Sequence, residues 1–252
     1  QDDTAIMKKL KAAMPTATSF ANSYVSYSLC CPSRTTFMTG QYMHNHGITW
    51  NFWPEGGYHK LQHSTNDGGW ANTMPKWLQN AGYNTALIGK FLNEYGTDDP
   101  TTPGDDSATQ RTLIPPGWTY WMGGVDPTTY SSFGYWLNEN GKLKQYGHCA
   151  KRVNFDGSVT TNPYAGCSPT SLVYDRINKD GTAYQTDVLS TKAESFISTY
   201  SRKTKPFFLW LTPNAPHTQT ATGLGEGLPA TPPQRYANVN FDSQWQTDML
   251  NK

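Results

Sequence analysis

The stretch Cys30-Cys31-Pro32-Ser33-Arg34-Thr35-Thr36-Phe37-Met38-Thr39-Gly40 is a C-x-P-S-R string that closes on Thr-Gly. Proline suits the first turn of a helix, because its φ is already helical and its missing N–H would have had no partner there. The string therefore predicts a short helix that starts near Pro32 and stops at Gly40. Cys30 would lie just ahead of the N-terminus, where free N–H groups and the helix dipole favour an anion. Arg34 adds a rigid positive fork that suits a tetrahedral oxyanion or a deprotonated nucleophile.

Downstream of this string, helices and strands alternate. A helix capped by Thr73 and closed by Gly82 leads directly into a strand-like run over residues 83–90. A second helix, capped by Thr186, precedes a continuous apolar strand over residues 207–211. A continuous apolar run of this kind is typical of a strand in a parallel sheet that is buried on both faces. Helix-then-strand units of this kind predict an α/β sandwich.

The remaining segments give weaker signals. A helix is expected from Asp3 or Thr4 to just before Pro15, and residues 19–26 read as a strand or extended chain that leads into the C-x-P-S-R string. Residues 96–182 lack clear periodicity and hold many Gly, Asn and Pro turns. We therefore expect this stretch to be mainly irregular, as a functional insertion or a small subdomain.

Composition fits a secreted α/β enzyme. A chain of 252 residues can bury a large core as one domain or a domain and a half. Its 20 Lys and Arg against 19 Asp and Glu argue against a nucleic-acid or membrane-surface partner, and no apolar run approaches a membrane span. The aromatic content of 13% suits stacking on sugar rings, although core packing explains any single ring equally well. The start at Gln1, without Met or a signal peptide, suggests a trimmed chain.

Two cysteines, Cys149 and Cys167, lie in a stretch rich in Gly, Asn, Ser and Thr. A disulfide between them would close a loop that has little core of its own, would stabilise it by roughly 3 kcal/mol and would imply an oxidising compartment. His148 with these cysteines could instead begin a zinc site, but the usual spacing of partner ligands is absent. The disulfide is the favoured prediction.

The C-x-P-S-R string resembles the signature of the type I sulfatases. In that family an enzyme oxidises the first cysteine to Cα-formylglycine, whose hydrate is the nucleophile, so the resemblance assigns this role to Cys30 and makes Cys31 the variable position. A G-K pair after a strand and a histidine after a buried strand resemble the motifs that sulfatases use around the sulfate. They point to Lys90 and His217, with Arg34 holding the activated nucleophile.

The likeness extends to sulfatases that act on glucosamine-6-sulfate groups. It is carried by residues 29–34, 41–47, 89–95, 115–118 and 215–217. Many arylsulfatases have a histidine two positions after the G-K lysine, which is proposed to regenerate the aldehyde, whereas this chain has Leu92 there. The base for that step would then be His217, His46 or a residue outside the chain, and His46 is also a candidate substrate contact.

The resemblance implies an alkaline-phosphatase-like sandwich with a mixed, largely parallel sheet between helices. It also implies one Ca²⁺, or alternatively Mg²⁺, bound by formylglycine at Cys30, by an Asp-Asp pair that ends the first strand and by an Asp-Asn or Asp-Gln pair late in the domain. No apolar strand precedes Asp2 and Asp3, so they are doubtful ligands, and nothing after His217 supplies the second pair. Residues 1–252 are therefore expected to be part of a catalytic domain that is incomplete at both ends.

The implied reaction is hydrolysis of a sulfate ester on a sulfated carbohydrate or an aryl sulfate. Maturation would require a formylglycine-generating enzyme, and the location would be secreted, lysosomal or periplasmic. Two alternatives stay open: a phosphodiester or phosphonate ester hydrolase of the same superfamily, and a catalytically incomplete carbohydrate-binding fragment.

Overall fold

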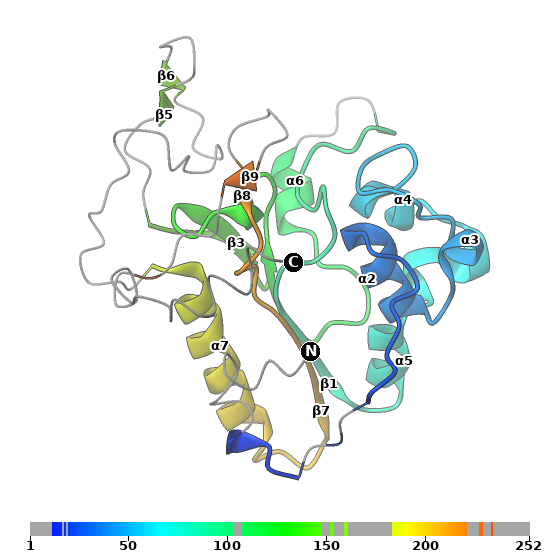
Figure 1. Ribbon diagram of the computed structural model, residues 1–252, viewed down its shortest axis with the longest axis vertical. Helices are drawn as coiled ribbons and strands as arrows, with labels where there is room; N and C mark the ends of the chain where they lie inside the picture. Colours follow the sequence, from blue (N-terminus) through cyan, green and yellow to red (C-terminus); the bar gives the residue numbers. More distant parts are fainter. Residues whose placement is uncertain are drawn as a thin grey trace.

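The centre of the molecule is a five-stranded sheet with the strand order β4-β3-β2-β1-β7 (Figure 1). Its strands are β1 (Asn84–Gly89), β2 (Tyr120–Gly124), β3 (Tyr135–Glu139), β4 (Lys142–Tyr146) and β7 (Phe207–Thr212). The computed structural model describes residues 12–16, 18, 20–102, 107–147, 152–153, 159–160, 183–220, 227–228 and 233. Two small strand pairs lie outside the sheet, β5 (Arg152–Val153) with β6 (Val159–Thr160), and β8 (Gln219–Thr220) with β9 (Gly227–Leu228).

The helices are short, apart from two. They are α2 (Cys30–Thr39), α3 (Met43–His46), α4 (Gly57–Gln62), α5 (Met74–Asn80), α6 (Ser107–Thr112) and α7 (Gln185–Tyr200), with 3-10 turns η2 (Asn66–Ala71) and η3 (Thr128–Tyr130). In the described part of the chain, no helix is both long and apolar enough to cross a membrane.

Helices cover both faces of the sheet, so the predicted α/β sandwich is confirmed. Alternate residues of β1 point to opposite faces: Ala86 and Ile88 pack with α7, whereas Leu87 packs with the residues of α2 and α4. In Figure 1, α7 lies on one side of β1 and β7, and α2 and α5 lie on the other. The core between the sheet and helices α2 and α4 is rich in aromatic rings, among them Tyr95 and Trp121.

The sheet is mixed rather than largely parallel. Strand β1 runs parallel to both β2 and β7, but the pairs β2–β3 and β3–β4 are antiparallel. Short connections join β2 to β3 and β3 to β4, and a short connection can only join antiparallel neighbours. These three strands, with α6, come from residues 96–182, so the expectation of a mainly irregular stretch was wrong for its described part.

The helix that carries the C-x-P-S-R string begins earlier than expected. Its first residue is Cys30, after the N-cap Leu29, so Pro32 lies inside the first turn, where a missing N–H still costs nothing. Gly40 ends it as expected, with a left-handed φ of 69° and an N–H that donates to Thr36 O at 2.8 Å. Of the expected N-terminal helix the structure describes residues 12–14, of which 12–13 are helical.

Two more helix starts can be compared with their expected caps. Thr73 is the N-cap of α5, but its hydroxyl donates back to Trp70 O and does not cap the helix. Helix α7 begins at Gln185, so Thr186 lies inside it. The Gln185 side chain explains the earlier start, because its amide donates to the carbonyls of Thr129 and Ser131 and ties the first turn to the loop after β2.

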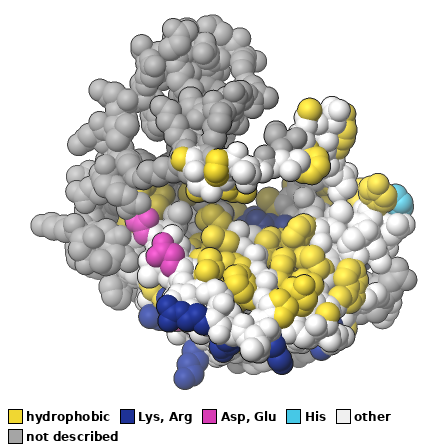
Figure 2. Space-filling view, turned by 90° about the horizontal axis from the view of Figure 1, so that it is seen from below, with side chains coloured by type: hydrophobic (Ala, Val, Ile, Leu, Met, Phe, Trp, Pro, Cys, Tyr) yellow, Lys and Arg dark blue, Asp and Glu magenta, His cyan; other side chains and the backbone are white. Residues whose placement is uncertain are grey.

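Strand β7 forms as predicted, but it is not buried on both sides. Among the described strands it pairs only with β1, and Leu211 is 43% exposed. Residues 20–26 form no strand, and the side chains of Phe20, Tyr24 and Val25 are exposed. Figure 2 shows hydrophobic side chains gathered on the face seen from below, where the lower end of β7 lies in Figure 1.

Candidate functional site

The carboxyl ends of β1 and β7 meet at the candidate site. Both strands run in the same direction, and Gly89 is opposite Thr212 at their ends. Ligand sites of open α/β sheets lie beyond this edge. Lys90 follows β1 directly, and its N–H donates to Thr212 O at 2.9 Å while the Thr212 hydroxyl donates to Lys90 O at 2.7 Å. These bonds fix the lysine backbone at the edge of the sheet.

Helix α2 brings the C-x-P-S-R string to the same edge. Arg34 Nη1 donates to Lys90 O at 2.9 Å, and the guanidinium carbon lies 5.7 Å from the centroid of the Trp210 ring on β7. Asn51 Oδ1 accepts the N–H of Cys31 at 2.9 Å, so it binds one of the free donors of the first helical turn. The topology thereby unites Cys30, Arg34 and Lys90, which lie in two separate stretches of the sequence.

Two cations surround the Cys30 side chain. Lys90 is 4% exposed, and its ammonium lies within hydrogen-bonding reach of Cys30. Burial lowers the pKa of Lys90, and Cys30 opposes this shift whereas Arg34 adds to it. Burial likewise lowers the pKa of Arg34, again opposed by Cys30. Two cations close to this position are chemically suited to bind the oxygens of a sulfate group or another oxyanion.

Cys30 and Cys31 differ strongly in their surroundings, although both are free thiols. Cys30 is partly exposed, whereas Cys31 is fully buried, and burial raises its pKa to about 12. Cys31 is therefore a core residue, and only Cys30 can be reached by a modifying enzyme or a substrate. If Cys30 is converted to formylglycine, the thiol sulfur marks the position of the hydrate oxygens.

His217 reaches the site through a residue that sequence reasoning missed, Tyr130 at the end of η3. The two rings have centroids 4.8 Å apart, and the Tyr130 hydroxyl accepts hydrogen bonds from Lys90 Nζ at 2.5 Å and Asn93 Nδ2 at 2.8 Å. His217 is exposed, and its Nδ1 donates to Thr218 O at 2.8 Å, which leaves Nε2 for a substrate. Asn93 lies in a stretch that the sequence singled out, but nothing in the sequence pointed to Tyr130.

His46 lies away from these groups. It is buried against α2, where Nδ1 accepts the N–H of Ile48 at 3.0 Å and Nε2 is 3.1 Å from the Thr36 hydroxyl. Burial lowers the pKa of His46. With both ring nitrogens bound inside the protein, His46 holds α3 against α2, and the structure does not support its expected contact with a substrate.

The structure does not place the expected acidic metal ligands or the expected disulfide. Asp2 and Asp3 lie outside the described residues, as do Cys149 and Cys167, so the metal pair and the disulfide remain predictions. Within the described residues, no three His, Cys, Asp or Glu side chains are grouped so that they could hold a metal ion. Leu92, at the position where many arylsulfatases have a histidine, is buried in the aromatic core.

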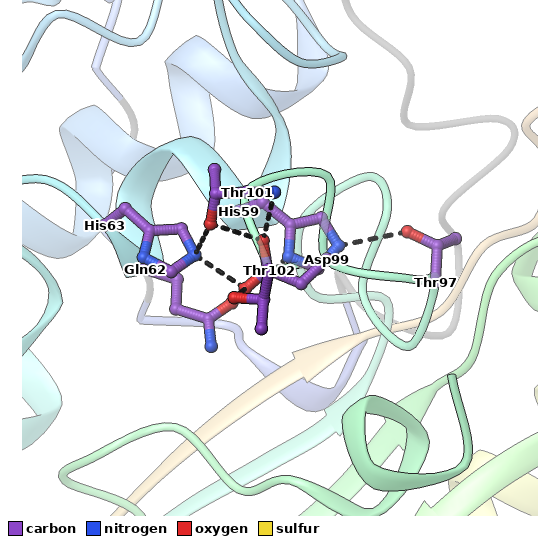
Figure 3. Close-up of polar contacts among 7 residues, drawn as sticks. All are labelled: His59, Gln62, His63, Thr97, Asp99, Thr101 and Thr102. Atoms are coloured by element: carbon purple, nitrogen blue, oxygen red, sulfur yellow. Dashed lines mark hydrogen bonds and ion pairs between the residues drawn. The ribbon is translucent and has the colours of Figure 1, made fainter. Parts of the chain in front are cut away.

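A second polar cluster ties α4 to the loop after β1 (Figure 3). Asp99 is its centre: Oδ2 lies 2.7 Å from His63 Nε2, and Oδ1 accepts the N–H of Thr101 at 2.9 Å. Burial acts to raise the pKa of Asp99, but the hydrogen bonds from Thr101 and His63 outweigh it and hold the pKa at about 2. His59 Nε2 lies 3.1 Å from the Thr97 hydroxyl in the same loop. These contacts lock the loop that follows Lys90.

Known proteins with similar sequences carry sulfatase names. An arylsulfatase of Volvox carteri is 30% identical over 225 residues, covering 89% of this chain and 27% of the relative. The human N-acetylglucosamine-6-sulfatase is 29% identical over 218 residues, covering 84% of this chain and 31% of the relative. The chain thus spans less than a third of the length of these two relatives.

One solved structure that this chain matches is BT4656 in complex with its substrate D-glucosamine-2-N,6-O-disulfate, at 24% identity and a TM-score of 0.47, covering 79% of this chain and 27% of that one. The family model described as Sulfatase matches residues 1–251. The mixed sheet between two helical layers agrees with the alkaline-phosphatase-like sandwich expected from the C-x-P-S-R string. With almost every residue matched by that model, this chain belongs to the sulfatase family.

Proposed function

We propose that the full-length protein containing this chain hydrolyses sulfate esters, with Cys30 converted to formylglycine. The observation that carries the proposal is the meeting of Cys30, Arg34 and Lys90 at the carboxyl end of β1. A thiol at the first position of a helix, partly exposed and flanked by two cations, suits both modification and the binding of a sulfate group.

Formylglycine at this position would supply, as its hydrate, one hydroxyl that attacks sulfur and a second whose deprotonation releases the sulfate. Lys90 and Arg34 would bind the charge that develops on the sulfate oxygens and the nucleophile. His217 Nδ1–H is bonded to Thr218 O, so Nε2 carries a proton only in the imidazolium form, and in that form His217 would donate the Nε2 proton to the ester oxygen that leaves. No three His, Cys, Asp or Glu side chains are grouped within the described residues, so a Ca²⁺ bound at formylglycine 30 would need acidic ligands from elsewhere in the protein.

The names of the relatives support a sulfated sugar as the substrate. Among them are N-acetylglucosamine-6-sulfatases, arylsulfatases and a Drosophila protein named as an extracellular sulfatase homologue. We infer a 6-sulfated amino sugar as the substrate class, a formylglycine-generating enzyme as the maturation partner and a secreted or lysosomal location. Residues 1–252 would then be one part of the catalytic domain.

The test uses the full-length protein, produced in a host that contains the formylglycine-generating enzyme. Mass spectrometry of the peptide spanning residues 29–34 should find the aldehyde at Cys30 and an intact side chain at Cys31. The preparation should hydrolyse 6-sulfated N-acetylglucosamine and an aryl sulfate. Cys30→Ala should abolish turnover, whereas the matched variant Cys31→Ala should keep both the aldehyde and the activity.

Two results would contradict the proposal. An unmodified thiol at Cys30 in an active preparation would exclude the formylglycine nucleophile. Faster hydrolysis of an aryl phosphate diester than of the aryl sulfate would favour the phosphodiesterase alternative, which shares the fold and the modification. The structure offers no specific support for that alternative.

A further inference from the structure

We propose that Tyr130 is a positioning residue for sulfate-ester hydrolysis, acting by holding the ammonium of Lys90 and the ring of His217 in place. This inference rests on the function proposed above. Tyr130 contacts both side chains, through its hydroxyl at 2.5 Å from Lys90 Nζ and through its ring, which lies against His217.

The direction of the hydrogen bonds makes Tyr130 the acceptor. An ammonium can only donate, and Asn93 also donates to the hydroxyl through Nδ2. Burial raises the pKa of Tyr130, so the side chain stays a neutral phenol. A carboxylate in this place would neutralise Lys90, whereas a phenol orients the ammonium and leaves its full charge for the sulfate.

Tyr130 is itself held rigidly. The Thr128 hydroxyl donates to Val125 O at 2.7 Å and accepts the N–H of Trp136 at 2.9 Å, which fixes η3 between β2 and β3. Gln185 donates to Thr129 O at 2.8 Å and anchors the same turn to α7. The Lys90 side chain has four rotatable bonds. A fixed acceptor holds its ammonium in one position before the reaction, so the entropy cost of ordering this side chain does not add to the activation barrier.

The test compares Tyr130→Phe with wild type in the modified full-length protein. The substitution keeps the ring beside His217 and removes only the acceptor for Lys90. We expect kcat for the aryl sulfate to fall about 10- to 100-fold, which corresponds to one hydrogen bond to a charged group, with a much smaller change in KM. The melting temperature and the fraction of aldehyde at Cys30 should stay unchanged.

A double-mutant cycle with Lys90→Met separates positioning from a general structural role. Lys90→Met alone should reduce kcat about 100- to 1,000-fold. If Tyr130 acts through Lys90, adding Tyr130→Phe to Lys90→Met should cause little further loss. Tyr135→Phe is the matched control, because the Tyr135 hydroxyl is buried without a recorded hydrogen-bond partner on the α7 side of the sheet. That variant should keep wild-type kcat.

The outcomes are distinguishable. If modified wild type hydrolyses no sulfate ester, the proposed function fails. If wild type is active but Tyr130→Phe keeps its kcat, or if the two losses simply multiply in the double variant, the role of Tyr130 is overturned and the proposed function stands. Should Tyr130→Phe fold poorly, Asn93→Ala is the second variant to test. Asn93→Ala should lower kcat in the wild-type background but should cause no further loss when it is added to Lys90→Met. An equal loss of kcat in both backgrounds would refute the proposal.

Discussion

Glu94, in the loop after Lys90, combines a left-handed backbone with a half-buried carboxylate. Its backbone has a left-handed φ of 68°, and its N–H donates to Asp126 Oδ2 at 2.7 Å. The carboxylate accepts the N–H of Trp53 at 3.0 Å, and it lies beside Gly57, which has a left-handed φ of 80° and where a Cβ would meet Glu94 Oε2. Glu94 thus joins the loop after Lys90 to the loop before α4.

Burial raises the pKa of Glu94 to about 7, so folding disfavours its charged form. The unfolded chain has an ordinary pKa near 4.5 at this residue, so its contribution to stability is full below that value and is lost as the pH rises through about 7. Glu94→Gln removes this titration and keeps an oxygen acceptor for Trp53. We expect the variant to gain about 1–2 kcal/mol relative to wild type between pH 5 and pH 8.

Thermal unfolding of both proteins at a series of pH values checks this prediction. The difference in melting temperature should be small at pH 5 and should favour Glu94→Gln at pH 8. A difference that stays constant with pH would mean that Glu94 titrates normally in the folded protein.

At the residue scale, the sequence could predict the part of the site that lies in short motifs. Cys30, Arg34 and Lys90 each follow from fixed spacing or from a strand end, and the structure brings these three together. Tyr130 could not be predicted, because its contact with Lys90 depends on how η3 is held between strands. His46 was misjudged for the converse reason, since a motif does not reveal that both ring nitrogens are bound inside the core.

At the scale of elements, two glycines with positive φ have different reasons to be glycine. Gly40 ends α2 with φ 69°, and a Cβ there would meet nothing within 4 Å. Gly89 ends β1 with φ 118°, and a Cβ there would lie 2.1 Å from Thr212 O on β7. A side chain in place of Gly40 would cost only backbone conformational energy. A side chain in place of Gly89 would also force apart β1 and β7, the two strands that place Lys90.

We therefore predict that Gly40→Ala destabilises the full-length protein by about 1–2 kcal/mol and leaves kcat for an aryl sulfate unchanged. Gly89→Ala should lower both the yield of folded protein and the activity, because backbone atoms must move to admit the methyl group. Denaturant unfolding and turnover of the two variants give the comparison. Equal effects of the two substitutions would contradict the assigned role of the β1–β7 junction.

The elements with clear periodicity were the predictable ones. Helix α5, strand β1, helix α7 and strand β7 follow the expected order. Strands β2 and β3 were missed because they contain glycines and an asparagine, which ordinarily indicate turns, and β4 was missed because it is short and mostly polar. Their structure depends on pairing with β1, which a local pattern cannot reveal. The exposed edge of β7 was missed because a continuous apolar run does not show whether a second neighbouring strand exists.

At the scale of the whole molecule, large apolar side chains are exposed at several places. Among the described strands β7 pairs only with β1, and its Leu211 is 43% exposed, while Tyr24, in the extended segment before α2, is 88% exposed. An open apolar edge strand favours association with other chains. The segment of 252 residues also spans only 27% to 31% of the length of the relatives compared above.

We therefore predict that residues 1–252 produced alone are poorly stable, bind calcium weakly and hydrolyse an aryl sulfate negligibly, even when Cys30 carries formylglycine. The segment would hold Arg34, Lys90 and His217 but no complete set of carboxylate ligands for the cation. Turnover, bound metal and aggregation state should be measured for the segment and for the full-length protein side by side. The full-length protein should be active and should contain calcium. Robust calcium-dependent hydrolysis by the segment alone would contradict this prediction and would make Asp2 and Asp3 the first metal ligands to test by substitution.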